Sequence, residues 1–231
     1  MAADGSAGRV RRTQEERSAD SRRRVIEATV ASLETNGYAA TTTAVVALKA
    51  GISRGGLFHQ YPTKVDLMID VVEETYREEM VAYDAWLARV TDPQERYYGL
   101  IERMWELLQR PKGMAVLEIM VGARSDPALA KRLAPLQRRL DQNSQKRVAQ
   151  HLRHAGLTAD ADDAPMLRLA VAAVRGLVIE KMFTEHPEEL NESVKRLREM
   201  FELYYSHRAE AAAQAAPATA RATDRATDRG A

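Results

Sequence analysis

The segment from Thr41 to Lys64, TTTAVVALKAGISRGGLFHQYPTK, constrains the fold more than any other, because it places several helix-start and helix-stop signals close together. Gly51 and Pro62 interrupt the apolar runs beside them, and Ser53 is a residue type that begins helices. These signals predict two short helices, at about 43–49 and 53–60, joined by a tight turn. Helices this short are marginal alone, so neighbouring helices must pack against them and fix their crossing angle.

Two short helices that cross near a right angle through a glycine-containing turn form the helix-turn-helix unit. The second helix of that unit fits the major groove of DNA and presents its first turn to the base edges. In this turn, Ser53 either caps the helix or donates to a phosphate, and Arg54 either binds guanine or pairs with a phosphate. The segment therefore predicts a DNA-binding surface that begins at Ser53.

The two glycines that follow Arg54 are unusual inside a helix. Gly55 and Gly56 each cost roughly 1 kcal/mol relative to alanine. One explanation is that the backbone must lie close against DNA. The other is that the glycines only relieve crowding between neighbouring helices.

Helical periodicity continues through nearly the whole chain and predicts an all-α fold of nine helices. The first helix begins either at the Thr13-x-x-Glu16 capping box or at Ser21, and it ends near Gly37. After the short pair, helices are expected near 64–90, 91–110, 111–120, 125–152, 163–184 and 187–207. We divide the chain into a basic, mostly flexible arm (1–20), a three-helix DNA-binding domain (21–66), a six-helix ligand-binding and dimerisation domain (67–208) and a disordered tail (209–231).

Composition excludes several classes of protein. The chain has 231 residues and no cysteine, which excludes disulfides and thiolate metal sites and favours a reducing compartment. There is no secretory signal and no apolar run long enough to span a membrane, so we expect a cytoplasmic protein without membrane contact. The net charge of +1 is unevenly distributed, with ten Lys/Arg against six Asp/Glu in residues 1–64. This basic excess is either a solvated tail or part of a nucleic-acid surface.

The residues from about Ser21 to Leu67 resemble the DNA-binding domain of TetR-family transcriptional regulators. The resemblance rests on NGYAATTT, on VALKAGISRGGLFHQYPTK and on the long helix that follows them. It implies a regulator, most often a repressor, that binds a near-palindromic operator in double-stranded DNA as a homodimer. It implies no cofactor and no metal.

The resemblance also implies roles for individual residues. Phosphate contacts would come from the start of the first short helix and from the start of the following long helix, and base and backbone contacts from the second short helix. The DNA-binding residues implied are Thr42, Thr43, Ser53, Arg54, Gly55, Gly56, Phe58, His59, Gln60 and Lys64. This chain departs from the family where Phe58 replaces a usual tyrosine, Gly56 a larger side chain and Leu48 a polar residue.

The last two expected helices suit dimerisation. The run MLRLAVAAVRGLVIEKMF is apolar around much of its circumference, which is more than one buried face requires. Ala170, Ala172, Ala173 and Gly176 permit a close approach of helices. Two such helices and their symmetry mates form a four-helix bundle across a two-fold axis, although the same helices also suit the core of a monomer.

Methionine and aromatic residues in the middle helices either form ordinary core or line an apolar pocket for a small-molecule effector. The candidate pocket residues are Trp86, Met104, Trp105, Leu108, Met120, Arg175 and Phe183. Arg124 and Arg175 interrupt apolar runs, and a buried arginine needs a partner. That partner is either Glu118 or Glu180, or the carboxylate of a ligand.

Two rival functions are weighed against the regulator. An enzyme is disfavoured because His151 and His154 lack a third metal ligand at a diagnostic spacing, and no phosphate loop or nucleophile elbow is present. The second rival is a DNA-bound structural or adaptor protein that uses the same fold without an inducer.

Overall fold

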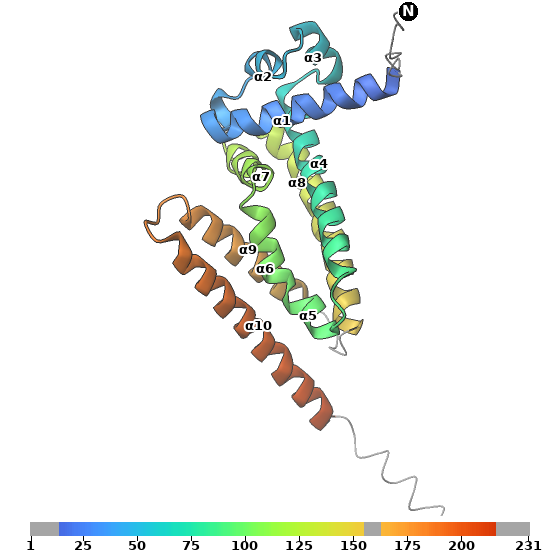
Figure 1. Cartoon of the computed structure of the whole chain (residues 1–231), viewed down its shortest axis with the longest axis vertical. Coiled ribbons are helices and arrows are strands. Elements are labelled where there is room, and N and C mark those ends of the chain that lie inside the picture. The colour runs from blue at the N-terminus through green and yellow to red at the C-terminus, as the bar shows by residue number, and fades with distance from the viewer. Residues whose placement is uncertain (1–13, 155–162, 216–231) are drawn as a thin grey trace, which may run out of the picture. The chain divides into compact units, whose positions relative to one another are not determined.

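The computed structural model describes residues 14–154 and 163–215, and within these ranges it contains helices and no strand (Figure 1). The all-α fold class is confirmed. The helices are α1 (Gln14–Ala40), α2 (Thr43–Ala50), α3 (Arg54–Gln60), α4 (Lys64–Leu87), α5 (Pro93–Tyr98), α6 (Leu100–Leu108), α7 (Pro111–Gly122), α8 (Pro127–His154), α9 (Asp163–Glu180) and α10 (Pro187–Ala215). No helix in the described ranges is long and apolar enough to cross a membrane.

The described residues contain ten helices where nine were expected, because the helix predicted near 91–110 is divided at Gly99 into α5 and α6. A Cβ atom at position 99 would lie 2.8 Å from Cζ2 of Trp86 and 2.8 Å from the carbonyl oxygen of Glu95. Only glycine permits this approach, so the break allows Trp86 to pack against the backbone.

Helix α1 begins at Gln14, which agrees with the first of the two expected starts, at the Thr13-x-x-Glu16 box, and makes residues 14–20 of the expected flexible arm helical. Glu15 and Glu16 lie in its first turn, where negative charge is favourable, and Asp20 pairs with Arg23. Helix α10 continues to Ala215 through the strong helix formers Ala, Glu and Gln, into the tail expected from 209. The remaining residues of the arm and the tail, 1–13 and 216–231, lie outside the described residues.

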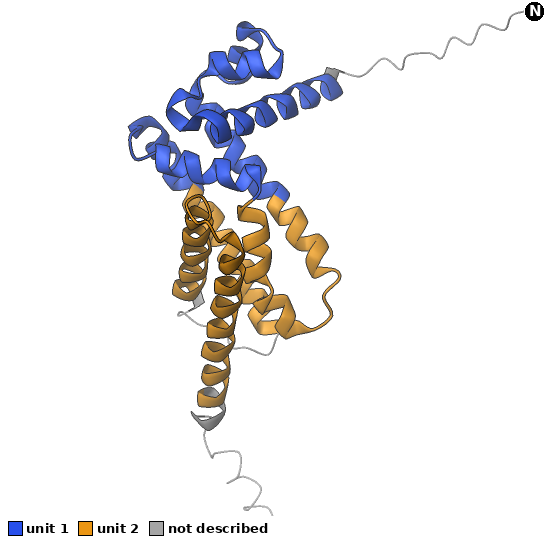
Figure 2. Ribbon diagram, turned by 60° about the vertical axis from the view of Figure 1, so that its left-hand side comes forward, with its two compact units in different colours: residues 1–78, 110–136 blue, residues 79–109, 137–231 orange. Residues whose placement is uncertain are grey.

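The chain divides into two compact units (Figure 2). Unit 1 comprises residues 1–78 and 110–136, and unit 2 comprises residues 79–109 and 137–231. The division falls within α4 and α8, so it does not coincide with the boundary at 66/67 expected from the sequence. The buried core of unit 1 includes Val25, Ile26, Leu33, Val46, Leu57, Leu67, Met68, Val71, Ile119 and Leu129. That of unit 2 includes Tyr97, Ile101, Trp105, Leu152, Val174, Val178, Val194, Phe201 and Tyr205.

The predicted pair of short helices is present in unit 1. Helix α2 buries Val46 and Ala47, and α3 buries Leu57, so tertiary packing holds both. Between them Gly51 has φ +65, the left-handed conformation that ends helices and favours glycine. This local geometry positions the first turn of α3 for the site described next.

Candidate nucleic-acid interface

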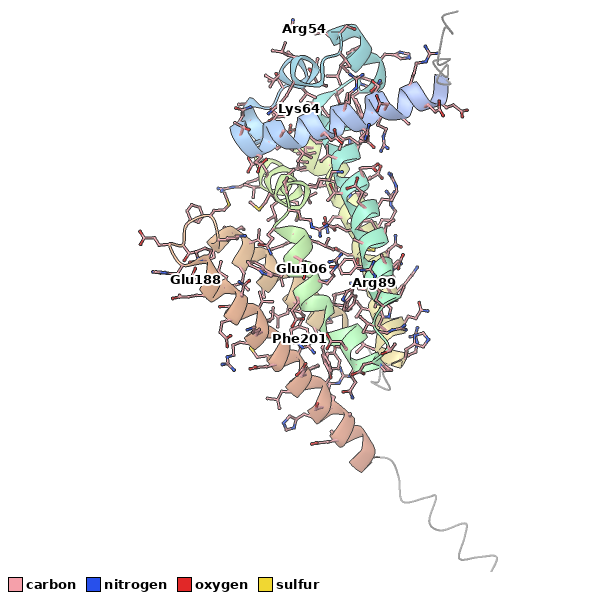
Figure 3. All side chains as sticks on the ribbon, viewed as in Figure 1. Arg54, Lys64, Arg89, Glu106, Glu188 and Phe201 are labelled. Atoms are coloured by element: carbon pink, nitrogen blue, oxygen red, sulfur yellow. The ribbon has the colours of Figure 1, made fainter. Side chains whose placement is uncertain are left out.

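The first turn of α3 is exposed from Ser53 to Gly56. Ser53 is the N-cap, and its Oγ accepts a hydrogen bond from the Gly56 amide at 3.0 Å. Of the two roles considered for Ser53, the structure therefore contains the cap. The Arg54 side chain follows directly on the exposed side of the helix (Figure 3). A guanidinium at a helix N-terminus gives this turn a positive, donor-rich character.

The two glycines in this turn do not relieve crowding between helices. A Cβ atom at Gly55 would have no neighbouring atom within 4 Å. At Gly56 it would meet only Ser53 Oγ, at 3.1 Å, within the same turn. The explanation that remains of the two is a close approach from outside the chain.

Two large apolar side chains beside this turn are exposed rather than buried. Leu48 on α2 is 84% exposed and Phe58 on α3 is 66% exposed. Large apolar side chains exposed on neighbouring helices often belong to a contact surface. Thymine methyl groups are one apolar partner that the major groove offers.

The start of α2 is also capped locally. Thr42 Oγ1 accepts a hydrogen bond from the Val45 amide at 3.2 Å, and its side chain is exposed, while Thr43 is half-buried. At the other end of α3, His59 and Gln60 are exposed, but Gln60 Nε2 donates to Ser21 Oγ at 2.9 Å. Gln60 therefore also fastens α3 to α1.

Lys64 is engaged within the protein, which the sequence did not predict. Its Nζ donates to the carbonyl oxygen of Tyr38 at 2.5 Å and lies 3.7 Å from the centre of the Tyr38 ring, at the end of α1 (Figure 3). Burial lowers the pKa of Lys64, and the nearby carboxylate of Asp126 opposes this effect. An ammonium has three donors, so the bond to Tyr38 leaves two for a phosphate.

Tyr38 joins four helices of unit 1, and sequence reasoning missed it. Its amide donates to Glu118 Oε1 on α7 at 2.7 Å, and its hydroxyl donates to Asp126 Oδ2, next to α8, at 2.6 Å. Its carbonyl accepts from Lys64 on α4, and its ring lies against Gly122 of α7, where a Cβ would be only 2.4 Å from Tyr38 Cγ. The hydrogen bond from Tyr38 is the main cause that lowers the pKa of Asp126.

A second polar cluster connects α1 and α3 with α4. Arg22 on α1 donates twice to Asp70, at 2.6 and 2.9 Å, and also pairs with Glu74 at 2.8 Å. Tyr61, at the end of α3, donates to the same Asp70 at 2.5 Å. Burial and this bond raise the pKa of Tyr61. Helix α3 is thus fixed at its C-terminal end while its first turn stays exposed.

In unit 2, the candidate pocket residues have different surroundings. Trp105 is buried and its Nε1 donates to Asn191 Oδ1 at 3.0 Å, while Leu108 is buried and Met104 is half-buried. Trp86 packs against Gly99. Met120 belongs to unit 1.

Phe183 does not belong to an enclosed pocket of this chain, because its side chain is 76% exposed. The expectation failed because α9 ends at Glu180, before the predicted end near 184, so Phe183 lies in the turn that follows.

The partners expected for the two arginines are also corrected. Arg124 is exposed, so it needs no buried partner. Glu118 accepts a hydrogen bond from Tyr38, and Glu180 is exposed at the end of α9. Arg175 is half-buried with its Nε enclosed, and its electrostatic neighbours are Asp141 and Glu79.

The outer faces of α9 and α10 carry large exposed apolar side chains. They are Leu169, Ile179, Met182, Met200 and Leu203, together with Phe183 in the connecting turn. A groove of about 510 Å³ lies on the same two helices, with Ala173, Leu177, Leu197 and Met200 in its lining. Val174 and Val178 on α9 are buried on the opposite side, so the helix has apolar residues on both faces.

Comparison with known proteins bears on this arrangement. Residues 25–71 match the family model described as bacterial regulatory proteins, tetR family. The chain is 29% identical to the HTH-type transcriptional regulator CymR of Pseudomonas putida over 183 residues, which cover 77% of this chain and 87% of that protein.

Solved structures share the fold at low sequence identity. A TetR-family transcriptional regulator from Rhodococcus sp. has a TM-score of 0.64 and 16% identity, covering 78% of this chain and 98% of that one. A transcriptional regulator from Saccharomonospora viridis, in complex with choline, has a TM-score of 0.62 and 18% identity, covering 80% of this chain and 96% of that one.

Proposed function

The chain belongs to the TetR family of bacterial transcriptional regulators, and from this premise we propose that it is a repressor that binds a near-palindromic operator as a homodimer and is released by a small, largely apolar effector. The observation that carries the proposal is the first turn of α3. There Ser53, Arg54, Gly55 and Gly56 are all exposed, and neither glycine has a packing role between helices.

In this proposal, Arg54 reads a base and the glycine backbone lies against the DNA strand. Phe58 makes apolar contact in the groove, and His59 and Gln60 line the strand. Thr42, Thr43 and Lys64 contact phosphates, which orient the protein on the duplex without reading sequence. The exposure of Thr42, Phe58, His59 and Gln60 supports these roles.

The homodimer forms through α9 and α10. Exposed apolar side chains on both helices support this, since a surface patch of that kind in an otherwise soluble fold commonly marks an interface. Gly176 is exposed and a Cβ there would meet nothing within 4 Å, which leaves room for a facing helix. A two-fold dimer places its two α3 helices about one DNA turn apart, or a multiple of it.

Release follows from a shift between two conformations. Bound effector favours a state in which α4 has moved and the spacing of the two recognition helices has changed, so DNA and effector weaken each other's binding. The contacts of Tyr38 support a path for this movement, because they join α1 to α4, α7 and α8 within unit 1. A structural neighbour was solved with choline, so a small organic molecule has a precedent in this fold.

Selection of preferred sites from a pool of random duplexes tests the function. The regulator should enrich a discrete near-palindrome with half-sites about one helical turn, or a multiple of it, apart. A structural or adaptor protein with the same fold should enrich no defined site, and its binding should not respond to any small molecule. Recovery of unselected sequence after several rounds would therefore reject the repressor.

A further inference from the structure

Unit 2 contains buried polar atoms that no neighbouring group satisfies. Among the described residues these are Glu102 Oε2, Arg103 Nε and Arg175 Nε. Buried polar groups in folded proteins nearly always have a hydrogen-bond partner, so each exception needs a physical reason. The three atoms differ in whether the rest of the side chain forms a hydrogen bond.

Glu102 and Arg103 each form a hydrogen bond through another atom of the same side chain. Glu102 Oε1 accepts from Arg198 at 3.2 Å, and Arg103 Nη1 donates to Glu106 Oε2 at 2.6 Å. The Nε of Arg175, at the middle of α9, is enclosed and has no hydrogen-bond partner. Among the described residues of unit 2, Arg175 is therefore a charged group with an unsatisfied donor and no other hydrogen bond to offset it.

The neighbouring carboxylates do not satisfy this donor. Asp141 on α8 and Glu79 on α4 act on the guanidinium electrostatically and favour its charged form. Asp141 is exposed and accepts a hydrogen bond from Gln137 at 2.8 Å. Burial lowers the pKa of Arg175 by more than these two carboxylates raise it, so they offset the cost of burying its charge only in part.

The helix that carries Arg175 buries apolar side chains. Val174 and Val178 of the same helix are fully buried, and α9 packs against α6, which carries the buried Leu108. Tyr83 on α4 is close enough to interact with Glu79, the same carboxylate that attracts Arg175. A half-buried cation attracts an anion more strongly than an exposed one, because less water competes there.

We propose that Arg175 binds the carboxylate of the effector, and that the effector is a small molecule with an apolar body and one carboxylate group. The guanidinium fork matches a carboxylate in bidentate geometry, with Nε and one Nη as the two donors. The inference rests on the proposed function, since it names the chemical class of its effector.

The first test needs no ligand. A buried charge that serves function destabilises the empty protein, and replacing it with an apolar side chain of similar length removes that penalty. Arg175→Met should therefore raise the Tm of the ligand-free full chain. Arg168→Met, at an exposed arginine of the same helix, is the matched control and should leave the Tm nearly unchanged. A fall in Tm for Arg175→Met alone would show that Arg175 pairs with Glu79 or Asp141 in solution, which overturns the proposal.

The second test uses pairs of probes that differ only in charge: benzoate and benzamide, naphthalene-2-carboxylate and its amide, octanoate and octanamide. At least one carboxylate should weaken operator binding by the wild-type chain by about tenfold or more, while its amide has little effect. Arg175→Met should abolish the response to the carboxylate, measured relative to the operator affinity of the same variant without probe. Equal action of acids and amides, an unchanged response in Arg175→Met, or no response to any carboxylate would each overturn the inference.

The two tests separate this inference from the proposed function. If the wild-type chain selects no DNA site, the repressor proposal fails, and the Tm comparison together with direct calorimetric binding of the same probes still decides the role of Arg175. If a site is selected but no carboxylate acts, only the effector class is wrong.

Discussion

In unit 1 the backbone and side-chain polar atoms of Tyr38 are all paired, whereas in unit 2 the buried Nε of Arg175 has no partner among the described residues. Unit 2 also presents apolar side chains to solvent, such as Met200 on α10 and Phe183 in the turn between α9 and α10. Among the described residues, unit 1 has no buried side-chain polar atom without a partner, and it exposes the first turn of α3. In unit 2, the proposed effector would give the Arg175 Nε a partner, and the proposed second copy of the chain would cover the exposed apolar side chains.

The dimer gives the largest expected effect. Changing Phe183 and Met200 together to glutamate places charge in the proposed interface, in the turn after α9 and on α10, and the cost of desolvating that charge should convert dimer to monomer. Operator affinity should fall by about a hundredfold or more, because one half-site alone binds weakly. Sedimentation equilibrium and operator binding measure the two effects. Val81→Glu, at an exposed apolar residue of α4, is the control and should remain dimeric.

The contacts that join Tyr38 to α4, α7 and α8, which we call the Tyr38 junction, give the next largest expected effect. This effect is on stability rather than on DNA binding. In Gly122→Ala the new methyl group would overlap the Tyr38 ring, so the free energy of unfolding should fall by about 2–3 kcal/mol. Denaturant titration measures it. Gly55→Ala adds the same methyl group where no atom lies within 4 Å, and its stability should stay the same or rise slightly. Equal losses in the two variants would show that the packing at Gly122 is looser than described.

Base reading by Arg54 is expected to contribute about 1–3 kcal/mol of operator binding. Arg54→Ala should therefore weaken binding to the selected operator and narrow the difference between that operator and a scrambled duplex. Its unfolding should be unaffected, since Arg54 is exposed. A loss that is the same on both duplexes would assign Arg54 to phosphate contact alone.

The first turn of α3, the contacts of Tyr38 and the environment of Arg175 differ in how far the sequence predicted them. The start of α3 was predicted and its cap was one of the two roles given to Ser53, because the cap joins Ser53 to Gly56 only three positions away. The Tyr38 junction was missed, since its partners Glu118 and Asp126 lie 80 and 88 residues along the chain and no local pattern connects them. Packing of distant segments decides such contacts, and local sequence rules do not contain that information.

Arg175 lies between these cases. Its position in an apolar run indicated a buried charge, and the structure makes the side chain half-buried with its Nε enclosed, but the partners suggested from the sequence were wrong. Phe183 was misplaced because the end of α9 differs by a few residues, and helix ends are the least predictable part of a helix. Which residues are buried is thus easier to predict than which residues pair with one another.

Lys64 connects the DNA surface with the Tyr38 junction, so its removal should affect both. Lys64→Ala should weaken binding to all duplexes alike and make the log-log salt slope shallower by about one. It should also lower the free energy of unfolding, because the Tyr38 carbonyl loses its donor. Lys49→Ala, which removes a similar lysine bond to the Ala31 carbonyl outside the junction, serves for comparison. An unchanged salt slope would remove Lys64 from the phosphate contacts and leave it a purely structural residue.

The smallest expected effect is a pH dependence of the Tyr38–Asp126 pair. The hydrogen bond from Tyr38 lowers the pKa of Asp126 in the folded state, so the stabilisation is fully present above the unfolded pKa of about 3.9 and is lost as pH falls through the folded value. The difference in unfolding free energy between wild type and Tyr38→Phe should therefore be largest near neutral pH and shrink in acid. A double-mutant cycle with Asp126→Asn separates the contribution of the charge. In the Asp126→Asn background, the loss of unfolding free energy caused by Tyr38→Phe should not depend on pH. A difference that stays constant from neutral to acid pH would mean that the hydroxyl contributes through packing, and that the charge of Asp126 plays no part in holding α8 to α1.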